Sequence, residues 1–577
     1  MQKTDELYAK AAQKFEIGDY EGAKKLANEC LKLDNKEFRA LNMLGVLLAN
    51  EGKDEAAINA YEKSLESNPK NPQTINNLAN LLSKSGELQK AASLYQNAIV
   101  LDPSFLVARN NFAKTALKLG RYDEAISESA RSFEMDSTDG SPLITLGNAL
   151  RQKKDYPAAE EAYKIALNYS GEVHKGALIE LGILKNEQKL FDEAIGYFVA
   201  VLQMDPNHAG SYCNISSILI DKGEIQKAKG AIIKAFELDP NDATNHINLG
   251  VLLKWEGRYE EAKNSFAKAI ELGDPKNAAK TNLGLILLAE GEYKDGFALY
   301  DYRPKKTLEC NAPLYDGSEC NNKSIFVYHE QGFGDTINFA RLLVHPKLQK
   351  ANIIFLPQAQ LHSVFKNSSL NIRTIGDSEL QDITFDTHTS LVDLLKTLEI
   401  TKDEIPQNIN YINANKERTE FFVSKIKSDK KKVGIVWSGN KNYLGDVLRS
   451  IDYKLFATLK NDKVSFVSLQ KEYEQGEMEY LKEHLGVLDF ADELNDFADT
   501  AALIAALDMV LTVDTSVAHL AATMNKPTWI LLPSAPDWRW GLEGDKTPWY
   551  ESARLFRKAQ DEDWAAVIER VRANLLQ

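Results

Sequence analysis

The chain has few cysteines, and they are not spaced as metal ligands. Only four of its 577 residues are cysteine: Cys30, Cys213, Cys310 and Cys320. Cys310 and Cys320 are ten residues apart without a partnering His or Cys, so their spacing disfavours a zinc site. The four residues are otherwise scattered, and we expect free thiols in a reducing cytoplasm.

Excess basic charge and long apolar runs are also missing. The chain has 69 Lys and Arg against 83 Asp and Glu, a net charge of −14. This balance argues against non-specific nucleic-acid binding, which needs clustered cations. No run approaches the roughly 18 apolar residues of a membrane span, and Met1 to Tyr20 lacks the apolar stretch of a signal peptide. We therefore expect a cytoplasmic protein that neither inserts into membranes nor binds nucleic acid.

A repeat with a period of 34 residues fills the first three hundred positions. Small residues, aromatic residues and prolines recur at fixed offsets, as at Gly147 and Tyr163. Each unit reads as two amphipathic helices joined by a turn such as Gly120-Arg121-Tyr122, and the pattern resembles the tetratricopeptide repeat. We predict an all-α solenoid over residues 1–303, with about nine units and a one-residue slip near Gly171.

Asparagine recurs at one register of the repeat, two residues before the small residue. It stands at Asn77, Asn111, Asn214, Asn248 and Asn282. Asparagine is a middling helix former, so its recurrence calls for a reason. Its amide both donates and accepts hydrogen bonds, as an extended peptide backbone does. The array resembles the asparagine ladder of protein O-GlcNAc transferases, interrupted here by Thr145 and Glu180, and implies a bound protein substrate. Local packing between repeats is the alternative explanation.

After residue 303 the pattern changes to short apolar runs separated by helical segments. We predict strands at 324–328, 352–356, 432–437, 464–469, 509–513 and 527–532, and helices at 336–343, 499–507 and 517–524. This alternation predicts an α/β region of two parallel-sheet halves, 304–430 and 431–577. The apolar pattern weakens between 377 and 427, where we place the end of the first half. Ligands of such folds bind beyond the carboxyl ends of the strands.

The segment Asp514-Thr515-Ser516 precedes one of these predicted helices. Free N–H groups and the positive dipole at a helix start favour phosphate, and Ser and Thr hydroxyls add donors. An ordinary helix cap is the alternative. The sequence has neither a Walker motif nor Gly-x-Gly-x-x-Gly, so triphosphate hydrolysis and dinucleotide binding lack support.

Several motifs together resemble one family of enzymes. They are Tyr-His-Glu-Gln-Gly-Phe-Gly-Asp at 328–335, Trp-Ser-Gly-Asn at 437–440 with Arg449-Ser450, Ser-Leu-Gln-Lys-Glu at 468–472, Asp-Thr-Ser-Val-Ala-His at 514–519, and the segments 533–540 and 548–550. The set resembles bacterial repeat-bearing glycosyltransferases, including flagellin glycosyltransferases, with heptosyltransferases and O-GlcNAc transferases as relatives. The resemblance implies the two-domain glycosyltransferase B (GT-B) fold and a nucleotide-sugar donor.

The resemblance also implies roles for individual residues. Asp335 matches the base that deprotonates the acceptor hydroxyl. His329 and Glu330 are the next candidates for this base. The alternative role of Asp335 is to cap the helix that follows. The residues matched to donor binding are Gly332, Gly334, Trp437, Ser438, Gly439, Asn440, Arg449, Gln470, Lys471, Asp514, Thr515, Ser516, Val517 and His519. For Arg449 a surface ion pair, and for His519 a structural role, are alternatives. Many metal-dependent transferases hold their metal with an Asp-x-Asp pair. In this sequence such a pair occurs only as Asp561-Glu562-Asp563, outside the motifs, so we expect no metal and no cofactor besides the nucleotide sugar.

These observations predict a protein O-glycosyltransferase that modifies Ser or Thr of a protein recruited by the repeats, with flagellin as the acceptor that the resemblance suggests. One alternative is a glycosyltransferase that acts on a lipid-linked or polysaccharide acceptor. Another is a protein-binding scaffold with an inactive transferase domain.

Overall fold

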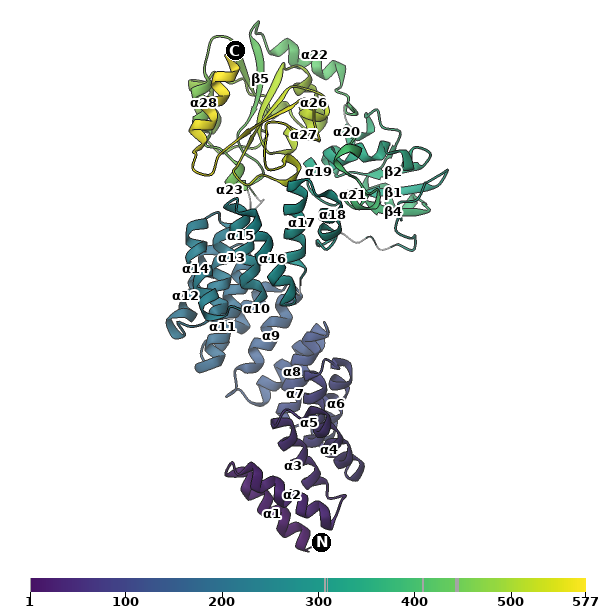
Figure 1. Ribbon diagram of the computed structural model, residues 1–577, viewed down its shortest axis with the longest axis vertical. Helices are drawn as coiled ribbons and strands as arrows, with labels where there is room; N and C mark the ends of the chain where they lie inside the picture. Colours follow the sequence, from purple (N-terminus) through teal and green to yellow (C-terminus); the bar gives the residue numbers. More distant parts are fainter. Residues whose placement is uncertain are drawn as a thin grey trace. The chain divides into compact units, whose positions relative to one another are not determined.

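The computed structural model describes residues 2–274, 276–305, 308, 310–406, 409–441 and 446–576, except for the side chain of Ile225 (Figure 1). Contacts divide the chain into two compact units, Met1–Ser211 and Tyr212–Gln577. The first unit holds helical repeats alone. The second holds further repeats and two parallel sheets.

The first unit consists of paired helices. Its six pairs are α1 (Gln2–Glu16) with α2 (Tyr20–Leu33), α3 (Phe38–Asn50) with α4 (Asp54–Ser67), α5 (Pro72–Lys84) with α6 (Leu88–Leu101), α7 (Leu106–Lys118) with α8 (Tyr122–Met135), α9 (Ser141–Gln152) with α10 (Tyr156–Ala166), and α11 (Gly171–Glu187) with α12 (Phe191–Met204). A Cβ on Gly182 would come within 2.8 Å of the Phe198 ring. The glycine and aromatic positions of the repeat thus let the helices of a pair cross closely.

Three more pairs follow, and they continue the same packing. They are α13 (Ala209–Asp221) with α14 (Ile225–Leu238), α15 (Ala243–Trp255) with α16 (Tyr259–Glu271), and α17 (Ala278–Glu290) with α18 (Tyr293–Tyr300). A Cβ on Gly250 would lie 2.6 Å from the Phe266 ring, which repeats the contact of the first unit. Gly257 has φ +72° in the turn between α15 and α16, a conformation that favours glycine.

Two sheets, each with all its strands parallel, form the rest of the second unit. The first has the order β3 (Arg373–Thr374), β2 (Asn352–Leu356), β1 (Ser324–Tyr328), β4 (Thr387–Ser390). The second has the order β6 (Val464–Ser468), β5 (Lys431–Val436), β7 (Met509–Val513), β8 (Thr528–Leu532), β9 (Ala553–Arg557). We call the parts built on them the first lobe and the second lobe. The predicted combination of a helical solenoid with an α/β region of two parallel-sheet halves is confirmed.

Helices of the lobes lie between the strands. They are α19 (Phe333–Phe339), α20 (His362–Lys366), α21 (Asp393–Thr397), α22 (Lys416–Lys425), α23 (Asp446–Arg449), α24 (Tyr453–Phe456), α25 (Glu477–His484), α26 (Phe497–Ala505), α27 (Ser516–Thr523) and α28 (Trp564–Leu575), with the short 3-10 helices η1 (Ala340–Val344) and η8 (Trp538–Trp540) among the turns. Among the described helices, none combines the length and apolar character that crossing a membrane requires. All four cysteines are free.

Strand β4 lies where the apolar pattern is weak. Its residues Thr387, His388, Thr389 and Ser390 are all buried. The Thr387 hydroxyl donates to the Pro313 carbonyl over 2.9 Å, and the His388 carbonyl accepts from the Tyr315 backbone over 2.8 Å. Backbone partners of residues 313–315 therefore hold a polar strand inside the protein, and apolar periodicity alone misses it.

One hydrophobic core joins the last repeats to both lobes. It contains Tyr293, Phe297 and Tyr300 of α18 together with Ile325 and Val327 of β1. The second lobe contributes Leu532 of β8 and the tryptophans Trp538, Trp540 and Trp549 to the same cluster. The last repeats are thus part of the folded body that carries the sheets.

Candidate functional site

Each sheet has a point where the strand order reverses. In the first lobe it lies between β1 and β4, and in the second between β5 and β7. Chain connections leave such a point in opposite directions, so the carboxyl ends of the two strands leave room for a ligand. Strand β1 leads into residues 329–335, β5 leads into Ser438, and β7 leads into Asp514. The predicted motifs therefore lie at both reversal points.

The helices that follow these strands meet between the lobes. Helix α19 packs against α27. A Cβ on Gly334 would lie 2.7 Å from Cδ2 of His519, so the absence of a side chain at 334 admits the imidazole. Nδ1 of His519 lies 2.9 Å from the Tyr550 hydroxyl, and its ring stacks on Trp540. Burial and three nearby arginines hold the pKa of His519 well below its ordinary value, so the ring is neutral and serves packing here.

An acidic and basic cluster joins the lobes beside this contact. The Arg539 guanidinium of η8 donates to Asp537 over 2.6 Å and also to Asp335 of α19. Asp335 accepts in addition from the Gly332 backbone N–H over 2.9 Å, which caps α19. The Asp335 side chain remains 21% exposed, whereas that of Arg539 is 7% exposed. We call Asp335, Asp514, Asp537 and Arg539 the interlobe cluster.

Two carboxylates of the interlobe cluster have raised pKa values. Burial raises the pKa of Asp335, and the charge of Asp537 adds to this against the opposing charge of Arg539. Burial and Asp537 also raise the pKa of Asp514 to about 6, against the opposing effects of Arg449, Trp540 and Arg539. Perturbed carboxylates at the meeting point of two lobes are typical of functional sites.

Helix α27 begins at the predicted phosphate turn. Thr515 is its N-cap residue, with extended backbone and no capping hydrogen bond from its own side chain. The Thr515 hydroxyl instead lies 3.2 Å from that of Thr512. Ser516 and Val517 follow as the first helical residues, both half-buried. The turn thus keeps the arrangement that favours an anion, because its N–H groups point out of the helix start.

The loop after β5 adds polar groups to this edge. The backbone N–H of Ser438 donates to Oε1 of Gln470 over 3.3 Å, and that of Gly439 donates to the Ser450 hydroxyl over 3.1 Å. Arg449 donates to Asp446 over 2.9 Å, and a Cβ on Gly439 would lie 2.8 Å from its Cζ. Arg449 therefore has an ion pair, whose side chains are 20% and 8% exposed, and it also packs against Gly439 of the loop. Asn440 continues the same loop.

Three residues of the predicted site have structural partners elsewhere. Trp437 is 1% exposed in the core of the second lobe, and its indole donates to Glu477 over 2.9 Å. Lys471 donates to the Ala491 carbonyl over 2.7 Å. Glu330 accepts two bonds of 2.7 Å from Arg303 and is 3% exposed. His329 lies beside it, with Nδ1 3.3 Å from the Leu356 carbonyl.

The asparagine register forms hydrogen bonds between repeats. Asn77 donates to Oδ1 of Asn42 over 3.3 Å, and Asn111 donates to Oδ1 of Asn76 over 3.1 Å. Asn248 donates to the Cys213 carbonyl over 3.1 Å and is buried. These bonds reach one repeat back and join neighbouring repeats. Asn282 accepts from Lys254 over 2.7 Å, and Asn214 lies in α13.

Sequence reasoning missed several residues of the site. Asp537 and Arg539 stand in a motif that was quoted for its resemblance, but no charge role was assigned to them. The repeats contain three more of these residues, Arg303, Tyr300 and Lys254. They stand at positions that the repeat pattern does not fix, so the sequence does not indicate what they contact. Asp537 and Arg539 could have been found from the sequence, because they form an acidic and basic pair shortly after a predicted strand and close to the predicted site.

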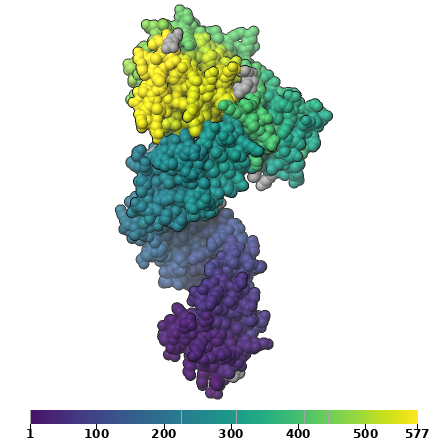
Figure 2. All heavy atoms as spheres, viewed as in Figure 1, coloured from purple at the N-terminus to yellow at the C-terminus, as the bar shows by residue number. Residues whose placement is uncertain are grey.

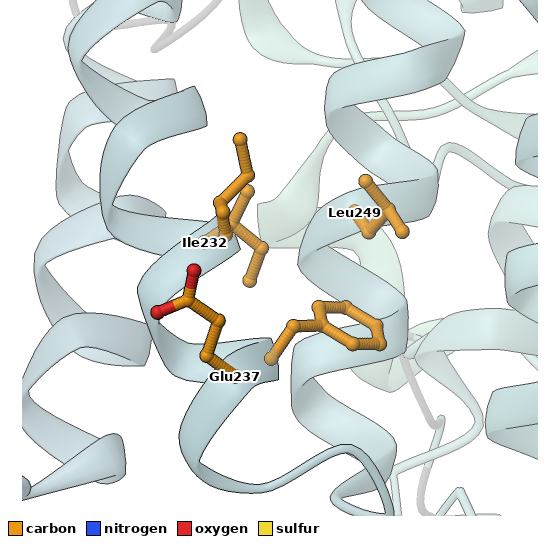
Figure 3. Close-up of a pocket in the computed structure, with 5 residues that line it drawn as sticks. Ile232, Glu237 and Leu249 are labelled. Carbon is orange, nitrogen blue, oxygen red and sulfur yellow. The ribbon is translucent and has the colours of Figure 1, made fainter.

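A separate apolar pocket lies on the repeats. Its volume is about 360 Å³, and it is lined by Ile232, Ile233, Phe236, Glu237 and Leu249. Figure 3 shows the apolar side chains of neighbouring helices facing one space, with the Glu237 carboxylate at its side. Among the described residues, no group of three or more His, Cys, Asp or Glu is placed to hold a metal ion.

Two kinds of protein family match the chain. Residues 8–72, 144–209 and 256–304 match one tetratricopeptide repeat family, and 209–242 match another. Residues 50–128 match "Anaphase-promoting complex, cyclosome, subunit 3". Residues 390–569 match "Glycosyltransferase family 9 (heptosyltransferase)". That match spans the second lobe and begins at the end of β4, so it includes Asp514 and Arg539 but not Asp335.

Individual relatives are distant. Protein FlbA of Caulobacter vibrioides is 25% identical over 309 residues, which are 48% of this chain and 51% of FlbA. The chain thus spans about half the length of this curated relative. The solved structure titled "Functional Characterization of Pseudomonas Aeruginosa pilF" is 19% identical, covering 36% of this chain and 93% of its own, with a TM-score of 0.32. A tetratricopeptide repeat protein from Parabacteroides merdae is 20% identical, covering 50% and 100%, with a TM-score of 0.32.

Proposed function

We propose that this chain, which combines tetratricopeptide repeats with a glycosyltransferase domain, moves a sugar from a nucleotide-sugar donor to a Ser or Thr hydroxyl of a protein. The repeats recruit the protein acceptor, and flagellin is the acceptor to test first because of the resemblance to flagellin glycosyltransferases. The reaction uses no metal.

One observation carries this proposal. Asp335, a carboxylate at the carboxyl end of the first sheet, is ion-paired with Arg539 of the second lobe. Helix α19, which contains Asp335, packs against α27, which begins at the carboxyl end of the second sheet. The helix start suits the phosphates of a donor, and the carboxylate suits the proton of an acceptor. The second of these lobes matches a glycosyltransferase family.

In the proposed reaction the acceptor oxygen forms a bond to the anomeric carbon of the sugar. The bond from that carbon to the donor phosphate breaks, and the phosphate leaves with the electron pair. Asp335 takes the hydroxyl proton, for which its raised pKa makes it a stronger base. The turn of Thr515 and Ser516 and the nearby cations offset the charge that develops on the leaving phosphate.

The donor half of the proposal is tested by thermal shift with UDP, GDP, dTDP, ADP and CMP. One of these nucleotides should raise the melting temperature, because a ligand of the folded state stabilises it by mass action. The sugar nucleotides of that base are then supplied with flagellin, and transfer is followed by mass spectrometry of the acceptor.

The base is tested by Asp335→Asn in the same assay. Transfer should fall by about 10²–10⁴-fold, the contribution of a positioned acid or base, while nucleotide binding stays within twofold. Asp377→Asn, which changes an exposed carboxylate of the first lobe, is the matched control and should leave transfer unchanged. Normal turnover by Asp335→Asn would remove Asp335 from the mechanism.

A further inference from the structure

The last repeats place a lysine, Lys254, within the electrostatic influence of Asp537. Lys254 lies at the end of α15, and its ammonium donates to Oδ1 of Asn282 in α17 over 2.7 Å. The Asn282 amide nitrogen in turn donates to the Ala278 carbonyl over 3.0 Å, which fixes the side chain. Lys254 is thus held by a neighbouring repeat.

The same repeats are packed against the segment that carries Asp537 and Arg539. Helix α17 contacts η8, and Trp538 of η8 packs edge to face against Tyr293 and Phe297 of α18. The Tyr300 hydroxyl accepts from Nε2 of Gln331 over 2.6 Å, in the loop that leads to Asp335. Helix α17 of the repeats therefore packs against η8, the element that carries Arg539. In Figure 2 the teal surface of these repeats adjoins the yellow surface of the second lobe.

The hydrogen-bond acceptor of Lys254 differs from those of the nearby arginines. Arg539 is bonded to Asp335 and Asp537, and Arg449 is bonded to Asp446. Lys254 is bonded to a neutral amide oxygen. An incoming anion can displace an amide from an ammonium at lower cost than it can displace a carboxylate, since a charged hydrogen bond is stronger than a neutral one.

The electrostatic surroundings agree with this difference. Burial lowers the pKa of Lys254 to about 8, and the charge of Asp537 acts in the opposite direction. A half-buried ammonium with only partial compensation gains from a second anion nearby.

We propose that Lys254, positioned by Asn282, is a substrate-binding residue of the transferase site that takes an anionic group, a phosphate of the donor or a carboxylate of the protein acceptor. The inference rests on the proposed function. It makes the last repeats a part of the site itself, beyond their role in recruiting the acceptor.

The test uses the full chain and its variant Lys254→Met. Isothermal titration with the nucleotide that stabilises the wild type measures nucleotide affinity and so tests whether Lys254 binds a donor phosphate. The acceptor KM at saturating donor tests whether Lys254 binds a carboxylate of the acceptor. About tenfold weaker nucleotide binding identifies the phosphate, and about a tenfold higher acceptor KM with unchanged nucleotide binding identifies the carboxylate. Both constants within twofold of wild type would overturn the proposal.

Two controls separate binding from folding. Lys280→Met removes a lysine of α17 that donates to Oδ1 of Asn277 over 3.2 Å and lies over the Tyr302 ring, and it should leave both constants unchanged. Lys254→Arg keeps a permanent cation, so its anion binding should persist at pH 9.5, where the wild-type interaction is lost. Identical pH dependence of the two proteins would also contradict the role of Lys254.

Failure of the proposed function gives a different result. In that case the wild type itself binds none of the nucleotides and transfers no sugar. A wild type that is active and indifferent to Lys254→Met refutes the role of Lys254 alone.

Discussion

The first six helix pairs and the last three share one repeat pattern but use their polar side chains differently. In the first unit Asn111 and Arg39 bond to other repeat residues, and the Arg39 side chain is 38% exposed beside Asp5 and Glu37. In the second unit Arg303 bonds instead to Glu330 and Asp393 of the first lobe, and its side chain is 5% exposed. The repeat pattern thus determines how helices pack, while the positions that vary within it determine what each repeat contacts.

The largest expected effect is on the buried ion pair that ties the last repeat to the first lobe. Arg303 donates to Glu330 over two bonds of 2.7 Å and to Asp393 over 2.8 Å. Arg303→Met leaves the buried Glu330 carboxylate without its cation, while Asp393 keeps its ion pair with Lys305 over 3.0 Å. We therefore expect a loss of about 3–5 kcal/mol in the free energy of unfolding of this unit, measured by urea denaturation.

Arg39→Met in the first unit is the matched comparison. Its ion pairs are more exposed, so its loss should be about 0–1 kcal/mol. Equal losses of unfolding free energy in Arg303→Met and Arg39→Met would mean that the burial of an ion pair does not decide its contribution to stability in these repeats.

An intermediate effect is expected at Asp514, and it depends on pH. The folded-state pKa of about 6 lies above the ordinary value of 3.8, so the folded protein binds more protons between these values. The stability contributed by this group is present below pH 4 and is lost as pH rises through 6. Asp514→Asn should therefore stabilise the protein by about 1–3 kcal/mol at pH 7.5.

The check is the urea midpoint of wild type and Asp514→Asn at pH 4 and pH 7.5. The gain should shrink toward zero at the lower pH, since Asp514 is then protonated in the folded protein. A gain of equal size at both values would show that removal of charge is not its cause.

Apart from the Arg39 comparison, the smallest expected effect is in the asparagine register of the first unit. Asn111→Ala removes two hydrogen bonds to Asn76 and Asn80, of 3.1 and 3.0 Å, and should cost about 1 kcal/mol in urea denaturation. The acceptor KM of the same variant tests peptide binding by this register. A raised KM supports the ladder, whereas a stability loss without a change in KM removes Asn111 from recruitment.

Much of the fold could be predicted because its signals are local. The strands at 324–328, 352–356 and 509–513 have the predicted bounds, since each is a short apolar run followed by a glycine or polar turn. Strand β4 could not be predicted in this way, because its residues are polar. The Thr387 hydroxyl and the His388 backbone are bonded instead to the backbone of residues 313–315.

The site was less accessible to sequence reasoning than the fold. Motifs after β1, β5 and β7 were found because they adjoin predicted strands. The sequence gives no indication that Arg303 forms an ion pair with Glu330, because these residues are 27 positions apart and lie in different parts of the fold. The Lys254–Asn282 bond, between neighbouring repeats, was hidden for the same reason.

The shared core of α18 and the two lobes has a practical consequence for dissecting the protein. A fragment that starts after residue 303 would expose Trp538 and Trp549, against which Tyr293 and Phe297 of α18 now pack. Such a fragment should aggregate on expression, because large apolar patches become accessible to solvent. A shortened enzyme intended for crystallisation should instead keep every repeat from Tyr212 onward.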